Sequence, residues 1–300
     1  MIELDASSVL LQWATGGLFF LWVTSRRREV GLGYGWLLRI TYGLLALLAA
    51  GLGWRFGWEP VRDLAAAGVA IAAVGALTSS YLRRSVGVAG PRAAAESRAA
   101  RVAAMVAPEG SAEPDLAAEP ASDSLAPSRP TSELPVDEFD PRLDLIAPLV
   151  GLVGLVAAGV HAGDPVWLSV ARMLVGAAFL GAVSDAMLLG HWYLVQPGLR
   201  RAPLVELVRW TGILWLPEVV LFLLPVGMVS VWTGSIDDGY AGMLGWFWAA
   251  CVVTTIGLVI VTLVALRERQ YSAVMAATGL LYLAILTGFG IDLVARASLA

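Results

Sequence analysis

Apolar residues occur along the chain in long runs, and short Arg-bearing segments separate these runs. A run of about 20 apolar residues is long enough to cross the hydrocarbon core of a bilayer as a helix. The pattern predicts eight such spans, at roughly 8–24, 34–54, 64–82, 145–160, 166–189, 207–232, 243–266 and 272–294. We therefore expect an all-α fold, a polytopic transmembrane helical bundle.

A long polar segment, 85–142, interrupts the apolar pattern after the third span. It is rich in Ala, Pro, Ser and acidic residues, and Phe139 is its only aromatic residue. Such a composition buries too little apolar surface to offset the entropy lost on ordering. We expect a mostly disordered linker between a three-helix unit at 1–84 and a five-helix unit at 143–300, a 3+5 arrangement. Docking of a partner by this linker stays open as an alternative.

Small residues at helical spacing predict which spans pack most closely, because lipid tails are as apolar as Leu and do not drive helices together. The third span carries Gly68, and the fourth carries Gly151 and Gly154. The fifth carries Gly176 and Gly181. These three spans are the expected centre of the bundle.

Arginine is unevenly divided between the two sides of the predicted bundle. One side carries Arg26–Arg28, Arg83, Arg84, Arg200, Arg201, Arg267 and Arg269, and the other carries Arg55, Arg62 and Arg296. Because Arg in short loops stays in the cytoplasm, the Arg-rich side is expected to be cytoplasmic. We therefore expect both termini outside and 85–142 in the cytoplasm.

The basic residues are all Arg, and the bias toward Ala, Gly, Val and Leu is typical of a high-GC bacterial gene. The expected location is a bacterial cell (inner) membrane.

Net charge and cysteine content limit the kinds of partner and site that the chain is expected to have. A formal net charge of −4 leaves no basic face for nucleic acid. The single cysteine, Cys251, cannot form an internal disulfide, and one thiol is too few for a metal cluster. The expected partners are the lipid bilayer and other membrane protein subunits, and no metal site is predicted.

Glu218 is the most prominent ionisable residue inside a predicted span. An ionisable group within a bilayer is costly and therefore marks a candidate functional site. Pro217 precedes it, and both Pro217 and Pro225 are expected to kink the helix. Thr211 and Trp215 share its helical face. We predict a proton or ligand site formed by Glu218, Thr211 and Trp215, with a structural hydrogen bond from Glu218 to a neighbouring helix as the alternative.

Two further charged residues lie inside spans near the cytoplasmic side. Arg39 lies in the second span and Asp185 in the fifth, at similar depths. Opposite charges at one depth predict an intramembrane ion pair that ties the three-helix unit to the five-helix unit. The alternative is that both side chains reach the interface independently.

The loop between the fifth and sixth spans is the richest polar segment of the membrane boundary. Guanidinium, amide and aromatic groups there are able to hold an anionic lipid headgroup, a quinone head or a partner subunit. The candidate residues are His191, Trp192, Tyr193, Gln196, Arg200 and Arg201. The alternative is an interface belt, because the positive-inside rule requires arginine here in any case.

Cofactor chemistry has little support in the sequence. His161 and His191 are the only histidines, and the predicted topology places them at opposite sides of the bilayer. A haem held by both is therefore not expected. Phosphate-binding glycine loops, HExxH motifs and nucleophile elbows are absent from the sequence. No cofactor is predicted, although haem on a single histidine and quinone both stay open.

These observations favour a non-catalytic integral membrane subunit or scaffold of a larger bacterial membrane assembly. The scarcity of cofactor ligands and the long linker are the reasons, and no catalytic residue is predicted. One alternative is a proton-coupled transporter or permease that uses Glu218. Another is a quinone- or haem-associated membrane subunit of a redox chain.

Overall fold

The computed structural model describes residues 5–84, 139–196, 199–268 and 270–299, and every regular element in these ranges is a helix. The predicted linker lies mostly outside them. In chain order the helices are α1 (Ala6–Ser25), α2 (Leu32–Phe56), α3 (Pro60–Leu82), the 3-10 helix η1 (Pro141–Leu145), α5 (Ile146–His161), α6 (Val166–Val195), α7 (Ala202–Leu223), α8 (Gly227–Trp232), α9 (Met243–Ala265) and α10 (Tyr271–Leu299).

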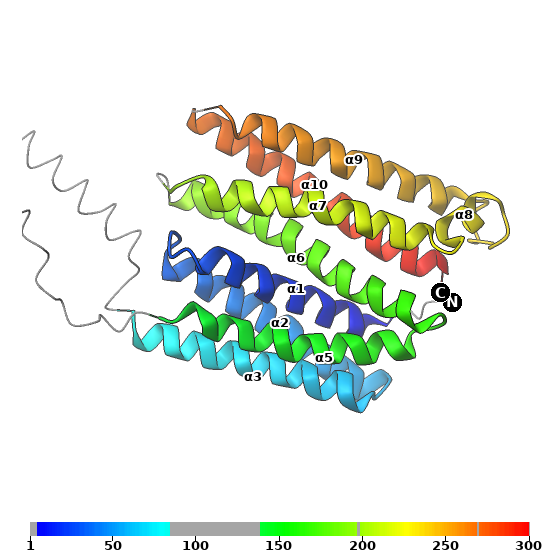
Figure 1. The fold of residues 1–300 in the computed structure, drawn as a ribbon, viewed down its shortest axis with the longest axis horizontal. Helices are drawn as coiled ribbons and strands as arrows, with labels where there is room; N and C mark the ends of the chain where they lie inside the picture. The colour runs from blue at the N-terminus through cyan, green and yellow to red at the C-terminus, as the bar shows by residue number, and fades with distance from the viewer. Residues whose placement is uncertain (1–4, 85–138, 197–198, 269, 300) are drawn as a thin grey trace, which may run out of the picture.

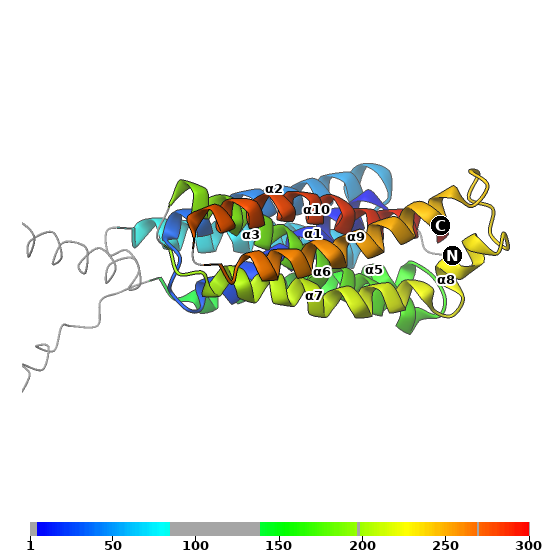
Figure 2. The same ribbon diagram turned by 90° about the horizontal axis from the view of Figure 1, so that it is seen from above.

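The long helices run side by side along the longest axis of the molecule (Figures 1 and 2). Both chain termini lie at one end of this bundle, which we call the terminal end (Figure 1). The C-terminal ends of α1, α3 and α9 and the N-terminal ends of α5 and α7 lie at the opposite end. We call this the Arg-rich end, because it carries Arg26–Arg28, Arg83, Arg84, Arg200, Arg201 and Arg267.

Seven helical segments are long and apolar enough to cross a membrane. They are α1, α2, α3, the η1–α5 segment, α6, α9 and α10, and each coincides with a predicted span. The predicted span 207–232 is instead divided, because α7 ends at Leu223 and α8 begins at Gly227. Pro225 lies in this break and has no N–H to continue the helical ladder. The prediction of a kink at Pro225 is therefore wrong, because the helix ends there instead. Pro217 does lie inside α7.

Helices α1 and α6 form the centre of the bundle. In the 18-residue apolar stretch that marks each candidate span, 67% of α1 and 61% of α6 is buried, against 33–44% of the other spans. Gly16 and Gly181 lie where the helices meet, and a Cβ on Gly16 would come within 1.7 Å of the Ala177 carbonyl oxygen. The two backbones are therefore in direct contact, as small residues permit.

The predicted close packing is confirmed for α5 and α6, but the central role of α1 was missed. Gly151 and Gly154 of α5 face Thr15 and Leu11 of α1. Helix α3 instead packs on α2 and α5 away from this centre, with only weak contact to α1. Since α1 packs on α6 and α3 packs on α5, the helices before and after residues 85–138 share one bundle.

The outer surface of the bundle is apolar. Leu44 on α2, Ile71 on α3, Val253 on α9 and Leu286 on α10 are each more than half exposed. Contiguous apolar surface of this extent is rare on soluble monomers, whereas a bilayer covers it. The chain has the fold of a multi-pass helical membrane protein.

Candidate functional site: buried ionisable groups

Several clusters of buried polar side chains lie in the part of the interior that the structure describes, and three of them contain residues singled out in the sequence. In an apolar surrounding such groups are unfavourable unless they find partners, so each cluster needs a physical account. The Glu218 cluster consists of Gln12, Arg172, Glu218, Asp292 and Arg296; the Asp185 cluster of Tyr34, Tyr42 and Asp185; and the Arg39 cluster of Ser25, Arg39, Phe139 and Asp144.

Glu218 is fully buried on α7, and with its carboxyl group ionised neither oxygen has a hydrogen-bond partner in the part of the chain that the structure describes. Its carboxyl group faces that of Asp292, and the two can share a hydrogen bond only when one of them is protonated. Its electrostatic neighbours are Asp292 and Arg296 on α10 and Arg172 on α6. Burial of a carboxylate without hydrogen bonds is strongly unfavourable, so a proton or a compensating charge must stabilise it. Glu218 is thus the least satisfied ionisable group of this cluster.

Asp292 and Arg296 form the fixed part of the Glu218 cluster. The Arg296 Nε donates to both Asp292 carboxylate oxygens, at 2.9 and 3.0 Å, one turn along α10. The Gln12 Nε2 of α1 donates to the same carboxylate at 3.4 Å. The Arg296 guanidinium also reaches the Arg172 carbonyl oxygen at 3.4 Å. Contacts from α1 and α6 therefore converge on one ion pair of α10.

Arg172 holds the end of α7. Its Nε donates to the Leu221 carbonyl at 3.0 Å, and its Nη2 donates to the Leu224 carbonyl at 2.6 Å. The last carbonyls of a helix lack intrahelical donors, and a guanidinium supplies them here. With two guanidinium and two carboxyl groups, the cluster has no net charge when all four are ionised. It gains one positive charge when one carboxyl is protonated.

The structure does not hydrogen-bond Glu218 to the residues predicted beside it. The Thr211 hydroxyl donates to the Leu207 carbonyl at 3.0 Å within α7. The Trp215 Nε1 donates to the Val252 carbonyl of α9 at 3.0 Å. Glu218 is the member of the predicted trio that belongs to the buried ionic cluster.

The missed residues of this site are Asp292 and Arg296. Their four-residue spacing near the end of the last span places them on one helical face and was the available signal. Gln12 carried no such signal, because a single amide in an apolar run has no partner within its own helix.

Asp185 is fully buried near the centre of the bundle. Its Oδ1 accepts a 2.5 Å hydrogen bond from the Tyr42 hydroxyl, and its carbonyl accepts one from the Tyr34 hydroxyl at 3.3 Å. Its Oδ2 has no hydrogen-bond partner among the described residues. Because both tyrosines belong to α2, Asp185 does connect an N-terminal helix to α6, but through hydroxyl groups.

The predicted ion pair between Arg39 and Asp185 is wrong. Arg39 instead forms a bidentate pair with Asp144 of η1, with Nε–Oδ1 at 2.8 Å and Nη2–Oδ2 at 2.9 Å. Both side chains are at most 2% exposed. The Ser25 hydroxyl donates to Asp144 at 3.0 Å, and the Phe139 ring covers the guanidinium at 4.5 Å. Asp144 therefore receives donors from α1 and α2 and satisfies both of its carboxyl oxygens.

The predicted polar loop is largely bonded within the protein. The His191 Nδ1 lies 3.1 Å from the Tyr282 hydroxyl of α10. The Trp192 Nε1 donates to the Gln196 amide oxygen at 3.1 Å. These contacts place the three predicted residues among side chains of the same chain at the Arg-rich end.

The rest of this loop links neighbouring helices. The Tyr193 hydroxyl donates to the Arg200 carbonyl, and the Arg201 guanidinium donates to the Glu268 and Gln270 carbonyls. The Arg200 side chain is 82% exposed and lies 3.9 Å from Glu29. Arg201 thus fastens the start of α7 to the turn between α9 and α10, while Arg200 faces outward.

The two histidines lie at opposite ends of the bundle. His161 is the last residue of α5 at the terminal end and lies 3.4 Å from Glu59. His191 lies in the last turns of α6, toward the Arg-rich end. Among the residues that the structure describes, no group of three or more His, Cys, Asp or Glu side chains is arranged to hold a metal ion.

Within the buried clusters, Glu218 is distinguished by geometry and charge: it is the carboxyl group with two unpartnered oxygens, and it faces a second carboxyl and two guanidinium groups. No protein-family model, curated protein or solved structure matches the chain.

Proposed function

We propose that the chain is a proton-coupled transporter or permease of a bacterial cell membrane, in which Glu218 binds and releases the proton. The observation that supports this proposal is the burial of both Glu218 carboxyl oxygens without a hydrogen-bond partner among the described residues. A purely structural carboxyl group would be expected to hold hydrogen bonds, as Asp144 does. A neutral, protonated Glu218 removes the charge penalty.

The mechanism follows from the charge of the Glu218 cluster. Protonation changes this cluster from neutral to one net positive charge in a region of low dielectric, where electrostatic interactions are strong. Glu218 and the carbonyls held by Arg172 belong to α7, whereas Asp292 and Arg296 belong to α10. Gain or loss of the proton would therefore shift the balance between two packings of α7 against α10. Such a two-state element is what coupling requires.

A second buried carboxyl group lies toward the Arg-rich end. Asp185 and Arg172 are 13 positions apart on α6, which corresponds to about 20 Å along a helix. Asp185 also keeps one oxygen without a partner in the described part of the chain. Two buried carboxyl groups at different depths fit a protein that moves protons between the two sides.

The proposed function includes a membrane topology with eight spans. We include α7 as an eighth span in a 3+5 arrangement, although Glu206, Arg209 and Glu218 make it less apolar than the others. Both termini would then lie outside and 85–142 in the cytoplasm, with transmembrane units at 1–84 and 143–300. The support is the concentration of arginine at the Arg-rich end.

The test uses the full chain in proteoliposomes that carry an imposed pH gradient and a trapped pH dye. Solutes are screened for those that dissipate the gradient when added. We expect at least one solute to do so with the wild type and not with Glu218→Gln. Glu206→Gln is the matched control, because the same substitution in the same helix falls on a partly exposed pair with Arg26 and Arg27. Equal flux in Glu218→Gln and the wild type would reject the proposal.

Two other functions remain predictions from the sequence. A membrane subunit or scaffold should co-purify with stoichiometric partners from native membranes in mild detergent. A quinone- or haem-associated redox subunit should retain extractable quinone or visible absorbance in the same preparation. In the redox subunit, the His191–Arg201 loop would bind the quinone head. One preparation from native membranes tests both functions, because it shows whether partners, quinone or haem accompany the chain.

A further inference from the structure

An open groove lies on the outer surface at the Arg-rich end, where the α1–α2 loop meets the first turns of α7. Figure 2 shows α7 along the outer edge of the bundle. The groove offers about 490 Å³ of space, which is within the roughly 300–1,000 Å³ of small-molecule sites. Its lining includes Arg27 of the loop and Val205, Glu206, Arg209, Trp210 and Ile213 of α7.

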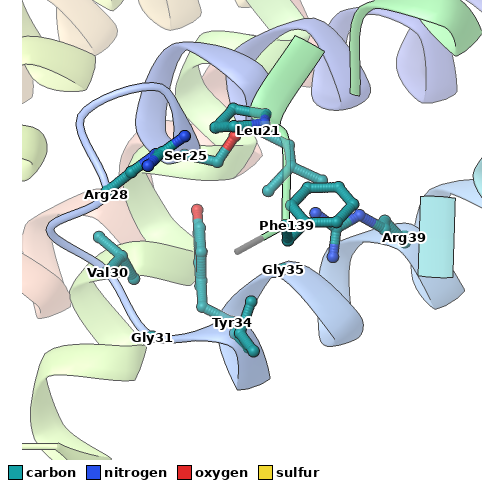
Figure 3. A pocket seen from close by; sticks show the side chains of 11 residues that line it. Leu21, Ser25, Arg28, Val30, Gly31, Tyr34, Gly35, Arg39 and Phe139 are labelled. Atoms are coloured by element: carbon teal, nitrogen blue, oxygen red, sulfur yellow. The ribbon is translucent and has the colours of Figure 1, made fainter. Parts of the chain in front are cut away.

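Arg209 brings an unpaired guanidinium group to this groove. The residue is exposed, and it forms no hydrogen bond or ion pair within the part of the chain that the structure describes. Other arginines toward this end are engaged inside the protein. Arg39 is buried beside Phe139 (Figure 3), and Arg201 donates to carbonyls of the α9–α10 turn. Guanidinium groups are the usual protein partners of phosphate oxygens, so Arg209 is available to a phosphate from outside the protein.

The charge at the groove is positive. Glu206 is the only acidic residue among the described residues that line it. The Glu206 carboxylate accepts from the Arg26 Nη2 at 2.6 Å and from the Arg27 Nη2 at 3.0 Å. The three guanidinium groups of Arg26, Arg27 and Arg209 are thus offset by one carboxylate, which leaves two positive charges in excess. Because Arg26 and Arg27 are both more than one third exposed, this excess charge attracts an anion at the surface.

The face of α7 that carries Arg209 becomes apolar toward the terminal end. Ile213, Leu216 and Val220 follow at helical spacing, and each is more than 40% exposed. Beside the arginine, the partly exposed Trp210 packs 6.2 Å from Phe20 of α1, and an indole at this position is typical of the headgroup level of a bilayer. A charged groove that continues into an exposed apolar stripe matches a lipid, whose chains would lie along α7.

We propose that this groove binds an anionic phospholipid, with Arg209 donating to the phosphate and the excess charge of Arg26 and Arg27 favouring a negative headgroup. The site lies on α7, beyond the loop that the sequence predicts as a headgroup site. It is on the outer surface and separate from Glu218, so Glu218→Gln should leave lipid binding unchanged. The proposal therefore does not depend on transport.

The test measures ligand-induced thermal stabilisation of the detergent-solubilised full chain. The probes are dioleoylphosphatidylglycerol, dioleoylphosphatidylcholine, whose headgroup has no net charge, and glycerol phosphate, which has no chains. Arg209→Gln removes the unpaired guanidinium, and Glu206→Gln removes the carboxylate that offsets Arg26 and Arg27. Arg267→Gln is the matched control, an exposed arginine at the same end outside the groove.

We expect saturable stabilisation by phosphatidylglycerol, weaker stabilisation by phosphatidylcholine and none by glycerol phosphate. Arg209→Gln should lower the apparent affinity for phosphatidylglycerol roughly fivefold, as loss of one arginine at a charged lipid surface does. Glu206→Gln should raise this affinity, and Arg267→Gln should leave it unchanged. A general loss of stability does not produce opposite effects in the two groove variants.

Four results would overturn the proposal. Equal stabilisation by phosphatidylcholine would remove the preference for a negative headgroup, and full stabilisation by glycerol phosphate would identify a soluble phosphate ester in place of a lipid. Full affinity in Arg209→Gln, or equal weakening by Arg267→Gln, would show that lipid binding does not occur at this groove.

Discussion

At the scale of single residues, the bundle is held together by polar pairs whose members are far apart in the sequence. Arg39 and Asp144 are separated by 105 positions, and Gln12 and Asp292 by 280. Each pair joins helices that hydrophobic packing alone would not align, because all outer faces of these helices are similarly apolar. Buried pairs of this kind specify which faces meet.

Loss of one partner of the buried Arg39–Asp144 pair should be strongly destabilising. Arg39→Met leaves the Asp144 carboxylate buried and unpaired, which costs about 3–5 kcal/mol. Arg39→Met combined with Asp144→Asn should recover most of this loss. Reversible unfolding in mixed micelles measures both. The control is Arg26→Met, whose pair with Glu206 is partly exposed and should cost less than about 1 kcal/mol. Equal losses for Arg26→Met and Arg39→Met would contradict the assignment.

The turn before α9 should depend on pH through Asp238. The Gly242, Tyr240 and Leu244 amides donate to its carboxylate at 2.8–3.0 Å and hold its pKa below the ordinary 3.8. The lowered pKa means that this contribution is present above pH 3.8 and is lost as the pH falls through the folded-state value.

Hydrogen exchange of these amides tests the effect. Asp238→Asn should reduce their protection at neutral pH, and the difference from the wild type should vanish in acid, after correction for intrinsic exchange. Asp237→Asn, which replaces the charged acceptor of a single amide contact to Gly239 by a neutral one, is the control. A difference between the wild type and Asp238→Asn that persists below the lowered pKa would argue against this role.

At the scale of elements, the spans could be predicted but their packing could not. Hydropathy is local, so the seven apolar segments follow directly from the sequence. Pro225 ends α7 because a proline is unable to donate in the helical ladder, and a hydropathy run does not register this loss. The central position of α1 depends on Gly16 meeting Gly181, and one glycine in an apolar run does not reveal its partner helix.

The same reasoning explains what was missed in the candidate site. Glu218 stood out because an ionisable group in an apolar run is conspicuous by itself. Asp144 did not, because it lies just before the predicted span 145–160 rather than inside it. Which residue pairs with Arg39 is decided by tertiary packing, and depth along the helices was a poor guide to it.

The α1–α6 contact should be intolerant of any side chain. Gly16→Ala places a methyl group within 1.7 Å of a backbone oxygen, so the helices must separate, at a cost of about 3 kcal/mol or more. Gly51→Ala on α2 has nothing within 4 Å of the new Cβ and should leave stability unchanged or slightly raised. Unfolding in mixed micelles compares the two, and similar stabilities would refute the backbone contact.

At the scale of the whole molecule, the proposed topology would place the Arg-rich end in the cytoplasm. Ser235, between α8 and α9, and Ser272, at the start of α10, are both exposed and lie at opposite ends of the bundle. An impermeant maleimide on intact cells should label Ser235→Cys and not Ser272→Cys. The native Cys251 is buried and should give little background. Labelling of Ser272→Cys alone would reverse the assigned orientation.

The whole molecule is best described as an apolar shell around polar clusters that join α1, α2, α6, α7 and α10. Most of these groups are satisfied by each other. The exceptions among the described residues include both oxygens of Glu218. The proposed function depends on this group taking up and releasing a proton while it is buried.

The most direct test is pH-difference infrared spectroscopy of the lipid-reconstituted protein. We predict a carboxyl C=O band that appears on acidification, shifts in D₂O, is absent from Glu218→Gln and is retained in Glu206→Gln. A spectrum in which no such band titrates while the fold persists, or in which Glu218→Gln keeps the band, would contradict the assignment of Glu218 as the proton site.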